Sequence, residues 1–480
     1  MSSETISATS SETATDSIDV ISPIDGSILE RIRKANTAKI ETAVQKAEDA
    51  FKEWALTPVR DRVKPLLALK SIIESRLEEL ATIISNENGK TVGEAGDEIR
   101  RGLEVIEFAA SIQHLPLESN LEVSRGVRCK TEHTPIGVTL GITPFNFPAM
   151  VPMWMFPISI ACGNSFILKP SEQTPLAAIK IAEYFAESGL PEGVFSVING
   201  DRETARQLIE HDSVKAVGFV GSTPAAKSIY ALAGQHGKRA LALGGAKNHI
   251  TLMADADPEI AAGNIVASAM GCAGQRCMAA SVLIQVGDCS HIIDKVLEIA
   301  KTITPGKDLG AVISAAARDR IVGYIDEAES QGANILLDGR DPGDAVPESG
   351  SWVGPTIIGD LPSRSRCLSD EIFGPVLSTV QVDSLDEALA IENASPFGNA
   401  ASIYTTNGDT AERYSSEANA GMVGVNIGVP VPRDPFPFGG WNASRFGVGD
   451  MTGTEGIRFW TQTKKITSKW SPKAARSWMS

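Results

Sequence analysis

An alternation of strand-like and helix-like segments over residues 143–243 constrains the fold of this chain more than any other feature. Short apolar runs with the composition of buried strands recur there: SFILKP, GVFSVING and AVGFVG. Each run is followed by a segment with helical spacing: TPLAAIKIAEYFAESG, ETARQLIEHD and TPAAKSIYALAGQ. Strands that alternate with helices in this way predict a parallel, Rossmann-like sheet within an α/β fold.

The rest of the chain divides into regions with different periodicities. The length of 480 residues favours two or three domains. Residues 37–109 show helical spacing of apolar side chains, and residues 120–143 change to an alternation that suggests a β hairpin. A second α/β section, over residues 244–430, contains the strand-like runs ANILLDG, IIGDLP and AASIYTT. The segment RFWTQTKKITSKW alternates again and could pair with the hairpin as an oligomerisation flap.

Charge and cysteine content narrow the class of protein. The net charge is −15 and no cluster of lysine and arginine stands out, which argues against a nucleic-acid partner. The segment MSSETISATSSETATDS has no Lys, no Arg and no apolar core, so it resembles neither a secretory signal nor a transit peptide. Six scattered cysteines without a CxxC pair are typical of reduced thiols, which predicts a cytoplasmic protein.

The stretch Met150–Leu168 is long and apolar enough to suggest a membrane span. Two prolines, Pro152 and Pro157, and the pair Gly163 and Asn164 interrupt it. We therefore predict a buried helix that runs into a strand, and no membrane partner.

A turn of small residues surrounds a cysteine in the segment GCAGQRCMA, Gly271–Ala279. Backbone N–H groups exposed beside a sulfur atom can stabilise a thiolate and hold an oxyanion. Taken alone the pattern is ambiguous, because most cysteines are small buried side chains. Cys277 is the candidate nucleophile of this segment, and Cys272 is expected to be a packing residue.

Three further segments carry polar groups that suit catalysis or nucleotide binding. In TPFNFP two prolines stiffen the backbone around Asn146, whose side-chain amide would be a good oxyanion donor, although an asparagine in a turn is the commoner case. The KPSE segment at Lys169 and the GST segment at Gly221 lie at predicted strand ends, where dinucleotides bind in α/β sheets. The sequence contains no GxGxxG fingerprint. Glu371 in EIFGPV is a carboxylate before a turn, which by itself is typical of a solvated charge.

Together the segments PFNFP, KPSE, GST, GQRC and EIFGPV, in this order, resemble the aldehyde dehydrogenase superfamily over residues 19–470. The resemblance implies the α/β aldehyde dehydrogenase fold. The expected parts are a flexible tail over 1–18, a Rossmann-like NAD-binding domain over 19–117 and 136–243, a small β oligomerisation flap over 118–135 and 459–480, and an α/β catalytic domain over 244–458.

By that resemblance Cys277 is the nucleophile, and Asn146 with the Cys277 backbone N–H forms the oxyanion hole. Lys169 and Glu172 would hold the adenosine ribose, and a carboxylate there disfavours a 2′-phosphate, so NAD is the expected cofactor. The other expected cofactor-binding residues are Phe145, Gly221, Ser222 at the pyrophosphate, Glu371 at the nicotinamide ribose and Phe373 near the nicotinamide. No metal site is expected.

The position of one glutamate distinguishes branches of this superfamily. Hydrolytic members carry it in an ELGGK-like motif, as the general base for the water that releases the acyl group. Counting back from Cys277 without a gap puts Leu243 at that position, and a shift of one puts Ala242 there; neither side chain accepts a proton. A thiol ionises more readily than water, so this absence fits transfer to coenzyme A as a co-substrate.

Finer details resemble the methylmalonate-semialdehyde dehydrogenase subfamily: the stretches GAKNH, GQRCMA and VGVN, and the ending GIRFWTQTKKITSKW. In that subfamily two arginines hold the substrate carboxylate, and Arg101 and Arg276 match them. An arginine beside a nucleophile also has a plainer explanation, as a structural ion pair or as a charge that lowers the thiol pKa. Gly244 and Gly245 depart from the subfamily's usual residues, which bears on the aldehyde more than on the CoA step.

These features predict NAD-dependent, CoA-acylating oxidation of methylmalonate or malonate semialdehyde to propionyl-CoA or acetyl-CoA, with loss of the carboxylate, through a Cys277 thioester. Two alternatives stay open: a hydrolytic aldehyde dehydrogenase that releases a free acid, and a catalytically silent NAD-binding structural protein. His249 could replace the missing base, although a histidine packed at a strand edge is the commoner case. The flap predicts a homodimer or homotetramer.

Overall fold

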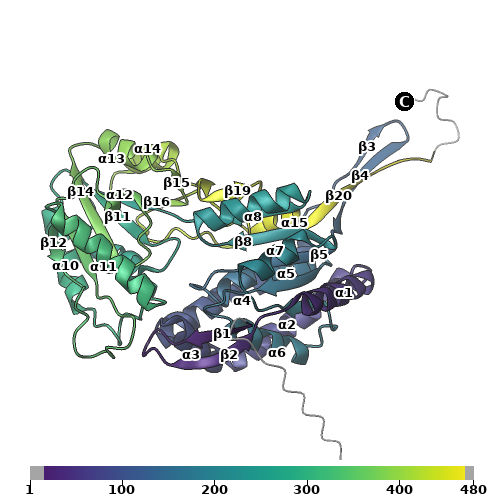
Figure 1. The fold of residues 1–480 in the computed structure, drawn as a ribbon. Helices are drawn as coiled ribbons and strands as arrows, with labels where there is room; N and C mark the ends of the chain where they lie inside the picture. The colour runs from purple at the N-terminus through teal and green to yellow at the C-terminus, as the bar shows by residue number, and fades with distance from the viewer. Residues whose placement is uncertain (1–15, 471–480) are drawn as a thin grey trace, which may run out of the picture.

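The computed structural model describes residues 16–470, which form two sheet-centred units and a projecting arm (Figure 1). Residues 1–15, most of the predicted tail, and residues 471–480, the end of the predicted flap, lie outside the described residues. The first strand already begins at Ser17, within the range predicted as tail.

The N-terminal region is a strand hairpin followed by four helices, as the helical spacing over 37–109 predicts. Strands β1 (Ser17–Ile21) and β2 (Ile28–Arg33) pair antiparallel. The helices are α1 (Thr37–Trp54), α2 (Val59–Ser75), α3 (Leu77–Asn88) and α4 (Val92–Ala110). A capping box starts α4, since the Thr91 hydroxyl accepts from the Glu94 N–H and the Glu94 carboxylate accepts from the Thr91 N–H.

The predicted Rossmann-like sheet is confirmed as a six-stranded sheet. Its order is β19 (Arg445–Gly447), β9 (Arg239–Leu243), β8 (Val214–Val220), β5 (Val138–Ile142), β6 (Ser165–Lys169) and β7 (Phe195–Val197). All neighbours are parallel except β19, which returns from the C-terminal part of the chain and pairs antiparallel with β9. The connecting helices are α5 (Met150–Ala161), α6 (Leu176–Glu187), α7 (Arg202–Glu210) and α8 (Thr223–Gln235). The segment proposed above as a buried helix running into a strand is α5 followed by β6.

The second α/β section is built on a seven-stranded sheet. Its order is β12 (Asn334–Leu337), β13 (Thr356–Gly359), β14 (Val376–Val382), β11 (Ala280–Val286), β10 (Asn248–Met253), β16 (Ala400–Tyr404) and β17 (Met422–Val425), all parallel except β12. The helices of this part are α9 (Pro258–Met270), α10 (Ser290–Thr302), α11 (Ala315–Ser330), α12 (Arg366–Ser369), α13 (Leu385–Asn393) and α14 (Gly408–Glu417). Helix α15 (Gly453–Phe459) leads into the last strand.

The arm is a three-stranded antiparallel sheet of β20 (Thr461–Lys469), β4 (Val127–Pro135) and β3 (Asn120–Ser124). It extends well away from both sheets (Figure 1). The predicted pairing of the last segment with the early hairpin is therefore confirmed. The prediction that the hairpin continues to residue 143 is wrong, because β5 lies in the centre of the six-stranded sheet.

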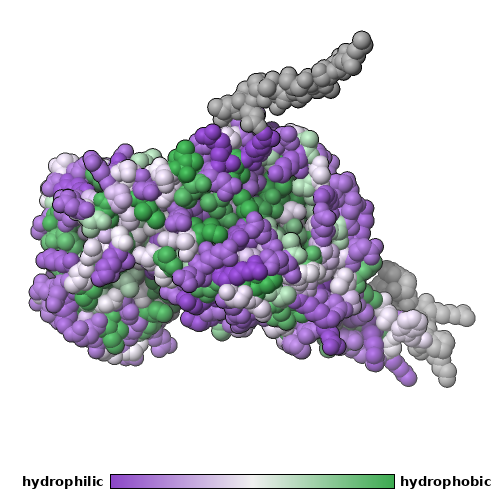
Figure 2. Space-filling model, turned by 90° about the horizontal axis from the view of Figure 1, so that it is seen from below, coloured by the Kyte–Doolittle hydropathy of each residue, from purple (hydrophilic) through white to green (hydrophobic). Residues whose placement is uncertain are grey.

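Apolar side chains are buried between the sheets and the helices that cover them, as in other α/β proteins. Every described residue of α5 except its first is buried, since the helix is covered on all sides. Among residues 16–470 no helix is both long and apolar enough to cross a membrane. The face seen in Figure 2 is largely hydrophilic, with hydrophobic residues gathered in patches near its middle.

Candidate active site

The loop that carries Cys277 is shaped by three successive residues in the left-handed region. Cys272 and Ala273 each have φ of 51° and Gly274 has φ of 67°. This turn follows α9 and brings Gly274 so close to a neighbouring loop that a Cβ there would lie 2.0 Å from the Gly374 carbonyl oxygen. Only glycine fits at that position. The turn therefore fixes the loop of Cys277 against the EIFGPV segment.

Cys277 is half-buried at the end of this loop. Burial raises the pKa of its thiol to about 12, and the Glu371 carboxylate acts in the same direction. The backbone N–H of Cys277 and the Arg276 guanidinium oppose that shift in pKa. The thiol is therefore neutral in this form of the protein, and a nearby positive charge is needed to favour the thiolate.

Asn146 lies in the loop between β5 and α5 and meets the Cys277 loop directly. Its side-chain Nδ2 donates to the Gln275 carbonyl oxygen at 2.9 Å, and the residue is 5% exposed. The amide nitrogen carries two hydrogens, so one can hold Gln275 while the other serves an oxyanion. The structure thus brings Asn146 and the Cys277 segment together, as an oxyanion hole requires.

A buried ion pair that sequence analysis did not predict supports the Asn146 loop. The Lys90 ammonium donates to the Asn146 backbone carbonyl at 2.7 Å and to the Glu98 carboxylate at 2.6 Å. The other Glu98 oxygen accepts from the Ala149 N–H at 2.8 Å. Both charged side chains are almost fully buried, at 1% and 0% exposed. No local pattern predicts this pair, because its partners come together only in the folded chain.

The carboxyl ends of three adjacent strands, β6, β5 and β8, meet at one edge of the six-stranded sheet. Lys169 ends β6, and its ammonium contacts the Glu172 carboxylate at 3.1 Å. Gly221 follows β8, and Ser222 is the N-cap of α8 but its side chain makes no capping bond. Its hydroxyl and the first N–H groups of α8 can therefore face an anion. This edge fits a dinucleotide, with hydroxyl partners at Lys169 and Glu172 and a phosphate at Ser222.

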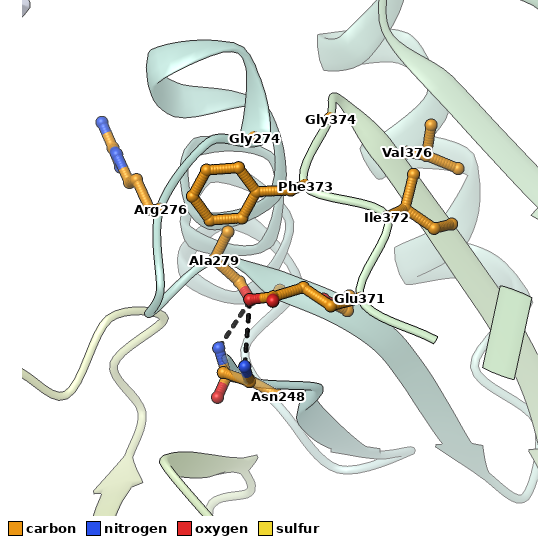
Figure 3. A pocket seen from close by; sticks show the side chains of 12 residues that line it. Asn248, Gly274, Arg276, Ala279, Glu371, Ile372, Phe373, Gly374 and Val376 are labelled. Carbon is orange, nitrogen blue, oxygen red and sulfur yellow. Dashed lines mark hydrogen bonds between the residues drawn. The ribbon is translucent and has the colours of Figure 1, made fainter. Parts of the chain in front are cut away.

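Glu371 and Phe373 lie on the loop before β14 and line a small pocket with Asn248 and Ala279. The Ala246 N–H donates to the Glu371 carboxylate at 2.9 Å. Figure 3 shows Glu371 directed towards Asn248 and Ala279, with the Phe373 ring beside them. Burial raises the pKa of the Glu371 carboxyl. The hydrogen bond from the Ala246 N–H and the charge of Lys247 oppose this rise in pKa.

Two contacts join the loop of Glu371 and Phe373 to the rest of the site. A Cβ at Gly245 would lie 2.3 Å from a Glu371 carboxylate oxygen, so glycine is needed for the carboxylate to sit there. Phe373, with φ of 54°, packs edge-on against Phe145 at 5.8 Å between ring centroids. Phe145 belongs to the Asn146 loop, so the two predicted aromatic cofactor contacts form one wall.

The two arginines expected at the substrate are each paired with a glutamate of α4. Arg101 forms an ion pair with Glu104 and donates to the Pro432 carbonyl at 3.5 Å. Arg276 lies 3.8 Å from Glu94 and donates to the Ala267 carbonyl at 3.3 Å. Figure 3 shows Arg276 directed away from Glu371. Each guanidinium carries five N–H donors, so donors beyond these contacts are available to a substrate carboxylate.

The two candidate positions for the missing base lie on opposite faces of β9. Leu243 belongs to the apolar cluster against which Cys277 packs, whereas Ala242 belongs to the cluster beneath the other face. Leu243 is therefore the residue on the Cys277 side of the strand. His249 is buried on β10, with Nδ1 3.0 Å from a Glu392 oxygen, as the packed-histidine interpretation predicts.

The known proteins to which this chain is similar are aldehyde dehydrogenases. A model of the aldehyde dehydrogenase family matches residues 9–466. A malonate-semialdehyde dehydrogenase of Halalkalibacterium halodurans is 44% identical over 459 residues, which cover 94% of this chain and 94% of that protein. The crystal structure of a methylmalonate-semialdehyde dehydrogenase from Oceanimonas doudoroffii has a TM-score of 0.93 at 40% identity and covers 96% of both chains. A crystal structure from Sinorhizobium meliloti, assigned to the same enzyme and complexed with NAD, has a TM-score of 0.93 at 39% identity, covering 99% of this chain and 97% of that one.

Proposed function

This chain belongs to the aldehyde dehydrogenase family, and from this premise we propose that it oxidises malonate or methylmalonate semialdehyde with NAD and transfers the acyl group to coenzyme A. The relatives reported above act, by name, on these semialdehydes. One observation carries the coenzyme A step. The β9 residue on the nucleophile's side is Leu243, which cannot take a proton from water.

In the oxidation step Cys277 loses its proton to solvent, and the thiolate attacks the aldehyde carbon. A C–S bond forms as the carbonyl oxygen becomes an oxyanion. The Asn146 amide and the Cys277 backbone N–H donate to that oxyanion. NAD, when bound, supplies the acceptor for the hydride that leaves the same carbon. Glu371 and Phe373 orient the nicotinamide end, and the acyl group is left as a thioester on Cys277.

In the second step the thioester must be cleaved by an external nucleophile. Water needs a general base, and Leu243 offers none. A coenzyme A thiol ionises far more readily and attacks the carbonyl carbon without such help. The new C–S bond forms as the bond to Cys277 breaks, so the acyl group leaves as a CoA thioester and the thiolate of Cys277 returns.

Besides its aldehyde, the substrate has one carboxylate that the protein must capture. The net charge of −15 repels anions at long range, so local cations are required. Arg101 and Arg276 are the residues we assign to this task. Loss of that carboxylate as carbon dioxide leaves a carbanion that the thioester stabilises, and this carbanion takes up a proton from solvent. Transfer then gives propionyl-CoA from methylmalonate semialdehyde and acetyl-CoA from malonate semialdehyde.

Cofactor choice follows from the ribose site. Glu172 contacts Lys169 at the end of β6, and its carboxylate would repel a 2′-phosphate. NAD is therefore favoured over NADP. The residues that hold it are Phe145, Lys169, Glu172, Gly221, Ser222, Glu371 and Phe373.

We further propose a cytoplasmic homodimer or homotetramer with no nucleic-acid or membrane partner. The arm supports an oligomer, because Leu121 and Val123 on β3 are 64% and 57% exposed. Apolar side chains on a projecting sheet are typical of a surface that a second chain covers. The NAD-binding, catalytic and flap domains predicted from the sequence complete this proposal.

Product analysis tests the proposed function. The protein is incubated with malonate semialdehyde, NAD and coenzyme A, and the products are identified by mass spectrometry. We expect acetyl-CoA and carbon dioxide, and no product from Cys277→Ser. A free acid as the main product would support the hydrolytic alternative. An absence of both NADH and any acyl product would support the silent alternative.

A further inference from the structure

The backbone carbonyl of Cys277 is held by two side-chain amides from different parts of the chain. Asn248 Nδ2 donates to it at 2.8 Å, and Asn399 Nδ2 donates to it at 2.8 Å. Both asparagines are buried, at 5% and 6% exposed. A carbonyl oxygen has two lone pairs, so both of its acceptor positions are used. The peptide that follows Cys277 is therefore fixed in orientation.

The sheet explains why amides are found at this point. In the parallel pair of β10 and β11, Asn248 is opposite Ala280 and His249 is opposite Val282, so Ser281 is skipped. A bulge of this kind interrupts the ladder of backbone bonds. Beside this bulge, Asn248 Nδ2 also donates to the Ala279 carbonyl at 2.9 Å, so its amide bonds the chain on both sides of Met278.

Asn399 reaches the same carbonyl from the other side of β10. It directly precedes β16, which pairs with β10, and its neighbour Ala400 donates its N–H to Asn248 Oδ1 at 3.1 Å. The two amides are thus linked to each other as well as to Cys277. Strands β10 and β16 are therefore both connected, through these asparagine side chains, to the Cys277 carbonyl.

We propose that Asn248 and Asn399 are positioning residues that set the direction of the Cys277 side chain towards the aldehyde. The inference rests on the proposed role of Cys277 as nucleophile. Asn146 holds the Gln275 carbonyl on the other side of Cys277, at 2.9 Å. The three amides therefore fix the backbone before and after the sulfur-bearing residue, and the oxyanion donor is part of the same frame.

The decisive variants are Asn248→Asp and Asn399→Asp. Aspartate keeps the size of the side chain, and at residue 248 it keeps the acceptor for the Ala400 N–H. It replaces the N–H donor with an oxygen that faces the Cys277 carbonyl. The change removes the bond that the proposal concerns, together with the bond of Asn248 to the Ala279 carbonyl and the contact of Asn399 with the Met278 sulfur. The serine variants named below remove the same bonds without adding a carboxylate.

Asn164→Asp is the matched control. Asn164 is also fully buried, and its Nδ2 donates to two backbone carbonyls, those of Ser159 at 3.1 Å and Trp460 at 2.8 Å. It belongs to no part of the proposed site. Its substitution therefore reports the loss of stability that follows from removing such a bond anywhere in the protein.

The measurement is the rate of the first NADH burst, with the KM for NAD and the melting temperature recorded in parallel. We expect the two site variants each to slow the burst at least about tenfold, since an error of ~1 Å in a reacting group costs about 100-fold in rate. The KM for NAD should stay within about twofold and the double variant should be less than additive, because both amides hold one atom. Asn164→Asp should lower the melting temperature and leave the burst unchanged.

The proposal would be overturned by a burst within about twofold of the unmodified rate in both site variants, together with melting temperatures that fall as in Asn164→Asp. The two buried amides would then contribute to stability without affecting the rate. If the aspartate variants do not fold, Asn248→Ser and Asn399→Ser are measured in the same way and judged by the same outcomes. If the unmodified protein gives no burst with either semialdehyde, the proposed function fails. The rate at which iodoacetamide alkylates Cys277 then tests the positioning role separately, with slower alkylation expected in the site variants only.

Discussion

At the scale of single residues, the environment of Cys277 makes its thiol a poor acid. Burial and the Glu371 carboxylate both raise its pKa, whereas Arg276 and a backbone N–H lower it. A positively charged nicotinamide close to the sulfur would favour the thiolate. In the proposed mechanism, binding of the cofactor would therefore favour activation of the nucleophile through charge.

Alkylation by iodoacetamide tests this coupling. Only the thiolate reacts, and the pKa of Cys277 is raised to about 12. The rate in cofactor-free protein should therefore rise about tenfold per pH unit between about pH 6 and about pH 9, without a plateau. NAD should increase the rate at any one pH in this range. Peptide mass spectrometry identifies the modified residue, with Cys277→Ser as control. A plateau near neutral pH without NAD would contradict the raised pKa.

Leu243→Glu tests the missing base. A carboxylate on the nucleophile's side of β9 could take a proton from water, so steady NADH formation without coenzyme A should rise at least about tenfold. Leu243→Gln is the matched control without a base, and Ala242→Glu places the same group on the opposite face. If steady NADH formation without coenzyme A increased in Ala242→Glu but not in Leu243→Glu, residue 242 and not residue 243 would be the position of the base.

At the scale of elements, the strand ends of the six-stranded sheet and the start of α4 are connected by buried charge. Lys90 and Glu98 tie the loop after β5 to α4. A buried charge that loses its partner is strongly destabilising, whereas an exposed pair contributes little. The position of Asn146 therefore depends on an ion pair outside the sheet.

Lys90→Met should lower the free energy of unfolding by about 3–5 kcal/mol, because it leaves the Glu98 carboxylate buried and unpaired. Adding Glu98→Gln should restore part of the loss, since glutamine still accepts from the Ala149 N–H. Urea unfolding measures both. Lys64→Met, which removes the exposed pair of Lys64 with Asp61, should cost less than about 1 kcal/mol. Equal losses in Lys90→Met and Lys64→Met would contradict this account.

The sequence predicts those elements that have a strong local signal. The runs SFILKP and AVGFVG lie between helices and predict the strands at 165–169 and 214–220. In strand β5, Thr139 and Gly141 alternate with apolar residues, and this pattern predicts a hairpin strand with one exposed face. In the structure all five residues are buried. A central strand covered on both faces can contain such small residues, so its alternation was misleading.

The residues of the candidate site can likewise be predicted only where the local sequence gives a strong signal. Motif residues such as Cys277 and Asn146 stand out in the sequence because their neighbours are unusual. Asn248 and Asn399 do not, because they bond a backbone carbonyl 29 and 122 positions away along the chain. The pairing of Arg101 with Glu104 could have been predicted, since residues three apart on a helix are neighbours.

At the scale of the whole molecule, the arm is the feature that a single chain does not explain. Strands β3, β4 and β20 project from the body (Figure 1), and β3 is exposed along its whole length. A three-stranded sheet with little cover is marginal by itself. Contact with a second copy of the chain would cover it.

Leu121→Asp combined with Val123→Asp tests this role of the arm. Charges in a covered apolar surface oppose association, so the mass in solution should fall towards that of a monomer. Light scattering coupled to gel filtration measures the mass. Leu56→Asp, at a position that is 80% exposed near the end of α1, should leave the mass unchanged. An unchanged mass in the β3 variant would exclude the arm from the interface.

The coenzyme A dependence of NADH formation tests the central claim most directly. Malonate and methylmalonate semialdehyde are each supplied with NAD, with and without coenzyme A. The account predicts one burst of NADH per active site without coenzyme A, and steady turnover only when it is present. Equal steady turnover without coenzyme A would mean that water cleaves the Cys277 thioester. The enzyme would then be a hydrolytic aldehyde dehydrogenase, and Leu243 would have no bearing on the choice of acceptor.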